Sequence, residues 1–148
     1  FQADLEKLDE VRLDEKFDVI IAGEMIEHLS NPGLFLRGIK RFMNDDTKLV
    51  ITTINAYCGL RFGIYFLRGK GGFNEPVHPD HVAYYSYSTL KLLIERENLK
   101  VADFLFYDVG IEHRKYSRWH YNLLNDISVK LSRQTCDGLI AVCKLSSN

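Results

Sequence analysis

The chain has 148 residues, a formal net charge of −1 at pH 7, and 46% hydrophobic residues. This length supports one folded domain with a core of its own. The near-neutral charge argues against an extended nucleic-acid surface, because phosphate binding depends on clustered Lys and Arg. No apolar run is long enough to cross a bilayer, and the three cysteines lack the close paired spacing of a zinc site or a disulfide framework. These features favour a cytoplasmic protein with reduced thiols.

The first residues, Phe1 to Asp9, are typical of a strand end followed by a turn. Asp4 is a candidate cap for the residues Leu5 to Leu8, because a short carboxylate accepts from the first free amides of a turn. The chain begins with Phe1 instead of Met, so we expect it to be a piece of a longer protein.

The stretch Phe17 to Ala22 is continuously apolar, which predicts a strand covered by helices on both faces. Glu24, Glu27 and His28 follow it directly. In an α/β sheet the chemistry gathers at the carboxyl ends of the strands. If a helix begins at Glu24, these three residues stand at i, i+3 and i+4, on one face.

Asn31 followed by Pro32 predicts a helix start, since Asn is a good cap and Pro fits the first helical position. Apolar residues then recur at helical spacing, which predicts an amphipathic helix lying on a sheet. They are Phe35, Leu36, Ile39, Phe42 and Met43. After a turn at residues 44–47, Lys48 to Ile54 predicts the next strand, giving a strand-helix-strand crossover.

Aromatic and basic residues alternate from Tyr57 to Phe73. The pattern fits either rings that stack on a ligand or a helix that packs its aromatics on the domain. The glycines at 69, 71 and 72 follow no strand and open no helix, so they do not predict a phosphate loop.

The remaining elements include a helix capped by Ser86 or Ser88 with apolar residues inward, ending near Asn98. Strands are predicted at Val101 to Tyr107 and Leu139 to Leu145. A helix is predicted between these strands from the spacing of Trp119, Leu123, Leu124, Ile127 and Leu131. The basic run before it, at 113–115 and 118, favours a solvated loop over an anionic ligand or membrane contact.

A family resemblance rests on Phe17-Asp18, Glu24-x-x-Glu27-His28-Leu29, Asn31-Pro32 and Leu49 to Asn55. Together they resemble the second half of a class I S-adenosylmethionine-dependent methyltransferase, in the subgroup that methylates small molecules such as quinone precursors and sugars. The match runs from about Ala3 to Leu145. The family's Gly-rich loop, which cradles the methionine end of the cofactor, has no counterpart in this chain.

The resemblance implies an α/β Rossmann-like sheet with strand order 3-2-1-4-5-7-6, of which this chain supplies strands four to seven, the last one antiparallel. Residues 1–148 would then be one partial methyltransferase domain. The strand at 17–22 would lie at an apolar sheet edge, so we expect the missing N-terminal half or a second copy to cover it.

The resemblance also implies site residues for methyl transfer to a small-molecule hydroxyl. The expected cofactor, S-adenosylmethionine, would be bound by Asp4, Leu5, Ala22, Gly23 and Glu24. His81 matches the family position whose histidine faces the reaction centre. His28 and His81 are the two expected catalytic residues, each as a general base or as a hydrogen-bonding residue. Asn55 follows a strand whose loop turns toward the substrate in the family, although a turn-forming role is simpler.

A metal-dependent alternative comes from the same residues. Glu24-x-x-Glu27-His28 with a distant histidine resembles the metal site of small-RNA 2′-hydroxyl methyltransferases. The ligands would be Glu24, Glu27, His28 and His81, a set that suits magnesium or a transition metal. The absent basic surface disfavours an RNA substrate. A non-catalytic interaction module is a further alternative, and a dehydrogenase is weaker because the terminal strand pair fits a methyltransferase better.

Overall fold

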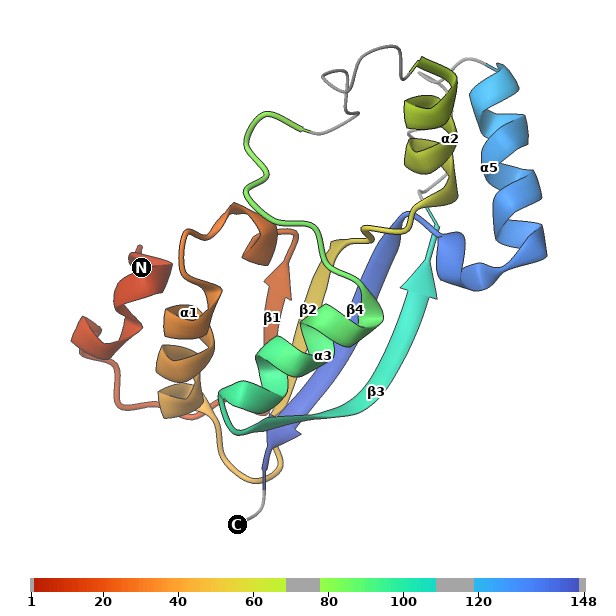
Figure 1. Cartoon of the computed structure of the whole chain (residues 1–148). Helices are drawn as coiled ribbons and strands as arrows, with labels where there is room; N and C mark the ends of the chain where they lie inside the picture. The colour runs from red at the N-terminus through yellow and green to blue at the C-terminus, as the bar shows by residue number, and fades with distance from the viewer. Residues whose placement is uncertain (1, 69–77, 109–118, 147–148) are drawn as a thin grey trace.

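The computed structural model describes residues 2–68, 78–108 and 119–146. One sheet contains four strands in the order β1-β2-β4-β3, as Figure 1 shows. The strands are β1 (Val19–Gly23), β2 (Lys48–Ile54), β3 (Leu99–Tyr107) and β4 (Gly138–Leu145). β1 and β2 are parallel, and β4 runs antiparallel to both β2 and β3. The predicted α/β class and the antiparallel last strand are confirmed.

Two helices connect these strands, and their predicted start signals are confirmed. The helix α1 (Pro32–Ile39) begins at Asn31, whose side chain accepts from the Leu34 amide at 3.2 Å. The helix α3 (Tyr87–Arg96) is capped by Ser86, and Asn98 follows it with a φ of 57°. Caps of this kind satisfy amides that have no partner within the helix.

The core lies on one face of the sheet, where both α1 and α3 pack (Figure 1). Leu49 and Ile51 of β2 point into it and are fully buried. On the opposite face, Val19 is 53% and Ile21 73% exposed. The prediction of helices over both faces of this strand is therefore wrong for the part of the chain that the structure describes.

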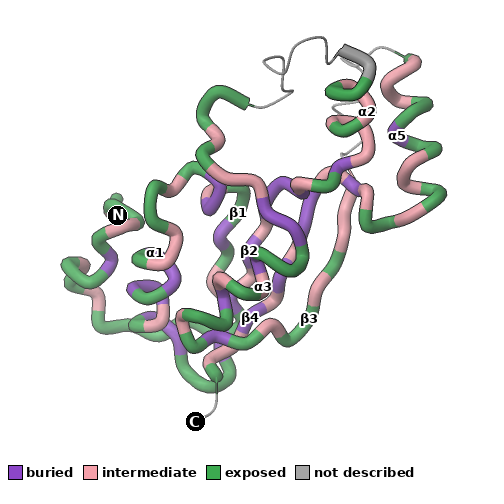
Figure 2. Tube along the Cα trace, viewed as in Figure 1, coloured by how far each residue is buried: buried purple, intermediate pink, exposed green. Residues whose placement is uncertain are grey.

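Two further helices, α2 (Gly59–Arg68) and α5 (Trp119–Leu131), pack against each other beyond the carboxyl ends of β1 and β2 (Figure 1). Figure 2 shows burial concentrated in the strands and under α1 and α3. Phe62 and Phe66 of α2 are 63% and 81% exposed, so of the two interpretations left open for this segment, packing of its aromatics on the domain does not hold for these two rings. The glycines at 69–72 and the basic run at 113–118 lie outside the described residues.

The N-terminal segment forms a 3-10 helix, η1 (Leu5–Glu10), which packs on α1. It confirms the turn predicted at Leu5 to Leu8 with Asp4 as its cap, whereas residues 2–4, the described part of the predicted strand end, form no strand. The three cysteines are buried free thiols, as predicted. Among the described helices, none combines the length and apolar character that a membrane span requires.

Candidate active site at the carboxyl edge of the sheet

Backbone hydrogen bonds join residues 82–85, which precede α3, to the segments that follow β1 and β2. The amides of Val82 and Ala83 donate to the Glu27 carbonyl at 2.9 and 3.2 Å, and the Ala56 amide donates to the Tyr85 carbonyl at 2.7 Å. Because these bonds fix residues 82–85, the preceding residue, His81, is held beside the turn that follows β1.

Glu27, His28 and His81 come together in this way. One potential ligand atom from each lies within 4.8 Å of the others. The imidazole centroids of His28 and His81 are 4.7 Å apart at 75°. His28 Nδ1 lies 2.9 Å from the Asp80 carbonyl oxygen, a contact that orients the ring and leaves Nε2 for another partner. The structure thus joins three residues that the sequence had singled out.

Glu27 is fully buried, and its two carboxylate oxygens differ. Thr53 Oγ1 donates to Oε2 at 2.8 Å, whereas Oε1 has no hydrogen-bond partner among the described residues. Burial raises the pKa of the Glu27 carboxyl, and the nearby Glu24 adds to this effect. An unpaired buried carboxylate oxygen costs free energy, so Oε1 is suited to receive a proton or a cation.

The surroundings of His81 favour the neutral form of its imidazole. Burial lowers the pKa of its imidazole, and the neighbouring His28 and His78 lower it further. Its Nδ1 is buried without a hydrogen-bond partner among the described residues. A neutral imidazole with a free nitrogen can accept a proton or bind a metal ion.

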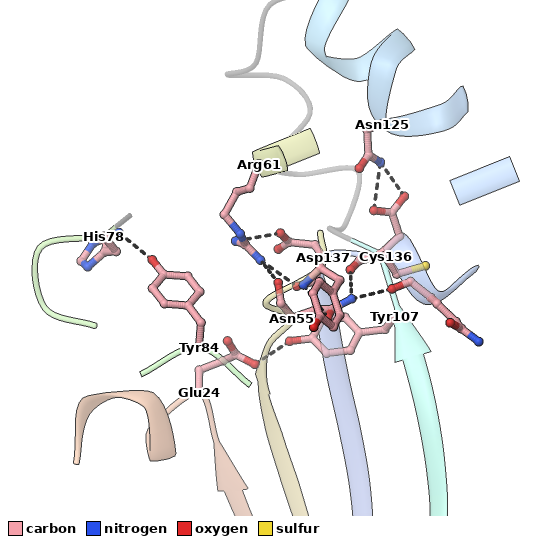
Figure 3. Close-up of polar contacts among 12 residues, drawn as sticks. Glu24, Asn55, Arg61, His78, Tyr84, Tyr107, Asn125, Cys136 and Asp137 are labelled. Atoms are coloured by element: carbon pink, nitrogen blue, oxygen red, sulfur yellow. Dashed lines mark hydrogen bonds and ion pairs between the residues drawn. The ribbon is translucent and has the colours of Figure 1, made fainter. Parts of the chain in front are cut away.

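His78 is a neighbour that the sequence did not single out. Its ring centroid lies 4.7 Å from that of His81, and its amide donates to the Tyr84 hydroxyl at 2.8 Å (Figure 3). Arg61 lies over the Tyr84 ring and forms an ion pair with Asp137 at 3.1 Å, which ties α2 to the start of β4. The spacing of His78 and His81 in a proline-containing loop was the available signal.

Glu24 does not join this group. Only Ile26–His28 form a helical turn, and Glu24 adopts a φ of 47°. Its carboxylate accepts instead from the Tyr107 hydroxyl at 2.5 Å (Figure 3). The prediction that Glu24, Glu27 and His28 share one helix face is therefore wrong, and the described cluster does not include Glu24 as a ligand.

The other residues predicted to bind the cofactor are not part of the cluster of Glu27, His28 and His81. Asp4 caps η1, where its carboxylate accepts from the Glu6 amide at 3.0 Å, and Leu5 opens the same turn. Ala22 is buried and Gly23 exposed at the end of β1. The Ala22 side chain belongs to the core, so only the backbone of this pair is available at the sheet edge. Their cofactor contacts remain predictions.

Asn55 has the simpler of its two predicted roles. It is 1% exposed, and its amide nitrogen donates to the carbonyls of Gln134 and Cys136, both at 2.8 Å. Its side-chain oxygen accepts from the Tyr57 amide at 3.0 Å. The residue thereby fixes the turn after β2 and the approach to β4.

A cavity of about 630 Å³ lies at the start of α3, and none of Glu27, His28 and His81 lines it. Tyr57 contributes to its wall, whereas α5 does not. The lining residues are Asn55, Tyr57, Ser86, Tyr87, Ser88, Phe104, Phe106, Ser132, Gln134 and Thr135.

Known proteins resemble this chain in sequence and in fold. It is 26% identical over 129 residues to the ubiquinone biosynthesis O-methyltransferase of Pseudomonas aeruginosa (81% of this chain, 50% of the relative). It is 24% identical over 106 residues to the enzyme of the same name from Bradyrhizobium diazoefficiens, and this match covers 66% of this chain and 42% of the relative. The chain spans about half the length of the curated relatives it matches.

Solved structures share the fold at low identity. A SAM dependent methyltransferase from Archaeoglobus fulgidus superposes with a TM-score of 0.63 at 16% identity, covering 97% of this chain and 66% of that one. The mitomycin 7-O-methyltransferase superposes with a TM-score of 0.56 at 15% sequence identity. The match covers 97% of this chain and 33% of that one. A protein-family model described as a methyltransferase domain matches residues 1–103, which is well over half of the 148 residues of the chain. The chain therefore belongs to the class I S-adenosylmethionine-dependent methyltransferase family.

Proposed function

We propose that this chain forms part of the catalytic domain of an O-methyltransferase that transfers the methyl group of S-adenosylmethionine to a hydroxyl of a small molecule. The observation that carries the proposal is the group of Glu27, His28 and His81 at the carboxyl end of β1. Enzymes named as ubiquinone biosynthesis O-methyltransferases are among the relatives, which favours a quinone-like phenol over a sugar as acceptor.

Methyl transfer requires the acceptor oxygen to be aligned with the methyl carbon and the proton of the acceptor hydroxyl to be removed. A methyl sulfonium is a strong electrophile, so the protein must chiefly place the acceptor oxygen behind the methyl carbon and exclude water. His81, held neutral, accepts the proton of the acceptor hydroxyl. The oxygen then bonds to the methyl carbon as the carbon–sulfur bond breaks, and S-adenosylhomocysteine leaves. His28, oriented by the Asp80 carbonyl, is the second candidate for proton acceptor or hydrogen-bonding residue.

The test uses the natural protein with S-adenosylmethionine and two acceptors, an ortho-dihydroxy aromatic acid and a free sugar. Mass spectrometry should show a methyl ether of the aromatic acceptor. Methylation of the sugar alone would contradict the quinone-like assignment. S-adenosylhomocysteine titrated in a calorimeter should bind, and a lack of binding would favour a non-catalytic interaction module.

A divalent cation is a second candidate component of this site, and the residues fit it. Glu27 Oε1 is buried without a described partner, and carboxylate oxygen with imidazole nitrogen suits magnesium or a transition metal. The Thr53 hydroxyl donates to Glu27, and the Asp80 carbonyl contacts His28 Nδ1. These contacts orient the two side chains as potential ligands. When bound, such an ion would hold the acceptor oxygen and favour loss of its proton.

The cation proposal is tested by titrating Mn²⁺ into the protein and reading free Mn²⁺ by electron paramagnetic resonance. Glu27→Gln should weaken binding about tenfold or more. Glu95→Gln is the control, because this glutamate is paired with Lys91 on α3 and is not part of the cluster, and it should leave Mn²⁺ binding unchanged. Equal binding by wild type and Glu27→Gln would overturn the metal site.

We also propose that further polypeptide covers the β1 edge of the sheet. β1 pairs only with β2 among the described strands, so its other edge is unpaired, and the side chain of Ile21 within β1 is exposed on the face opposite the core. Unpaired apolar edges promote association. Hydrogen exchange of the β1 amides in the natural protein should be slow, and light scattering distinguishes a covering segment of the same chain from a second copy. Fast exchange would contradict this proposal.

A further inference from the structure

Tyr107 reaches across the carboxyl edge of the sheet from its far side. It is the last residue of β3, and its register partner is Gly138 of β4. The ring crosses toward β1, and its hydroxyl donates to Glu24 Oε1 at 2.5 Å, as Figure 3 shows. One hydrogen bond thus joins the ends of the two outermost strands, β1 and β3.

Gly138 leaves the space that this crossing needs. A Cβ at position 138 would lie 2.2 Å from the Tyr107 ring carbon Cζ and 2.6 Å from its hydroxyl oxygen. Real Cβ atoms do not approach that closely, so a side chain at 138 would displace the ring. A glycine within a strand often marks such a close approach.

Glu24 is held from the backbone side as well. Its amide donates to the carbonyl and to Oγ1 of Thr52, both at 3.1 Å, with the backbone in the left-handed region. These bonds fix the residue that carries the carboxylate directly after β1. Burial and the bond to Glu24 raise the pKa of the Tyr107 phenol, which therefore keeps its proton and remains a donor.

We propose that Tyr107 is a positioning residue that holds the Glu24 carboxylate at the end of β1 to receive the ammonium group of the cofactor. This inference rests on the proposed function, and it adds a residue from β3 that no family resemblance of the sequence had assigned. Tyr107 occupies Oε1, which leaves Oε2 of Glu24 to accept from the cationic ligand. A charge-assisted hydrogen bond of this kind favours one fixed geometry.

The experiment is a double-mutant cycle on S-adenosylhomocysteine affinity, measured by calorimetry in the natural protein. Tyr107→Phe should weaken binding roughly tenfold, the effect of one hydrogen bond to a charged group. Glu24→Gln should weaken it at least as much, and Tyr107→Phe should add nothing in the Glu24→Gln background. Tyr65→Phe, at an exposed position of α2 that does not line the cavity, is the matched control and should bind normally.

The outcomes separate the two proposals. If Glu24→Gln weakens binding and Tyr107→Phe does not, Glu24 contacts the cofactor but the positioning role is wrong. If neither weakens a ligand that the wild type binds, the cofactor contact of Glu24 is wrong too. The titration of Tyr107 gives a readout besides affinity, because its absorbance change should move to lower pH in Glu24→Gln. An unchanged titration would overturn the inference.

Discussion

Glu24 and Glu27 are three residues apart, yet they belong to two different regions of the sheet edge. Glu27 is fully buried on the core side, bonded to Thr53 and next to two imidazoles. Glu24 is exposed and bonded to Tyr107. Glu24 has a positive φ and lies outside the helical turn Ile26–His28, so the two carboxylates do not follow helical spacing.

The Glu27 region depends most on His81. We expect His81→Gln to lower kcat by about 10² to 10⁴, the usual contribution of a general base. His78→Gln is the matched control, since its ring also lies 4.7 Å from that of His81, and its effect should stay below about tenfold. Equal losses in both variants would assign the effect to the shape of the loop.

The contrast between the two carboxylates can be tested through their threonine partners. Thr53→Val removes the donor to Glu27, so Mn²⁺ affinity should fall about 10- to 100-fold, as for other residues that support metal ligands. Thr52→Val, on the Glu24 side, should leave Mn²⁺ affinity unchanged. A loss of Mn²⁺ affinity in Thr52→Val alone would reverse the assignment.

The Glu24 region is sensitive to volume. Gly138→Ala should lower the free energy of unfolding by about 1 to 3 kcal/mol, because the new methyl group meets the Tyr107 ring. Gly63→Ala, inside α2 with no atom within 4 Å of its Cβ, should raise it by about 0.5 to 1 kcal/mol. Urea unfolding of both variants measures the difference, and a neutral Gly138→Ala would disprove the tight crossing.

The smallest expected effect concerns pH. Because burial, His28 and His78 lower the pKa of His81 from its ordinary 6.5, the acidic limb of kcat/KM should lie below pH 6.5. His78→Gln removes one positive charge and should move that limb upward, toward 6.5. The pH dependence of initial rates checks this, and a wild-type limb above pH 6.5 would contradict the neutral state of His81.

Local signals in the sequence predicted most of the fold. The predicted strand at Lys48 to Ile54 has the observed bounds, and the caps at Asn31 and Ser86 begin their helices as expected. The outer face of β1 was mispredicted, because an apolar run shows that a strand can be covered, and not that it is covered within this chain.

The site was predicted only in part. His28 and His81 were named and lie together, whereas Thr53 and Tyr107 were missed. Their contacts to Glu27 and Glu24 span 26 and 83 positions, and no local spacing encodes such distances. Helical spacing also assigned Glu24 to the wrong group, because it assumes a regular helix where the chain makes a single turn.

The central claim is that the methyl acceptor meets the protein at His28 and His81. The most direct measurement is the histidine side-chain NMR spectrum of the natural protein with S-adenosylhomocysteine, before and after addition of the aromatic acceptor. The resonances of His28 and His81 should shift, while that of His120, on α5, should not. If the acceptor binds and the resonances of His28 and His81 both stay unchanged, the account is contradicted.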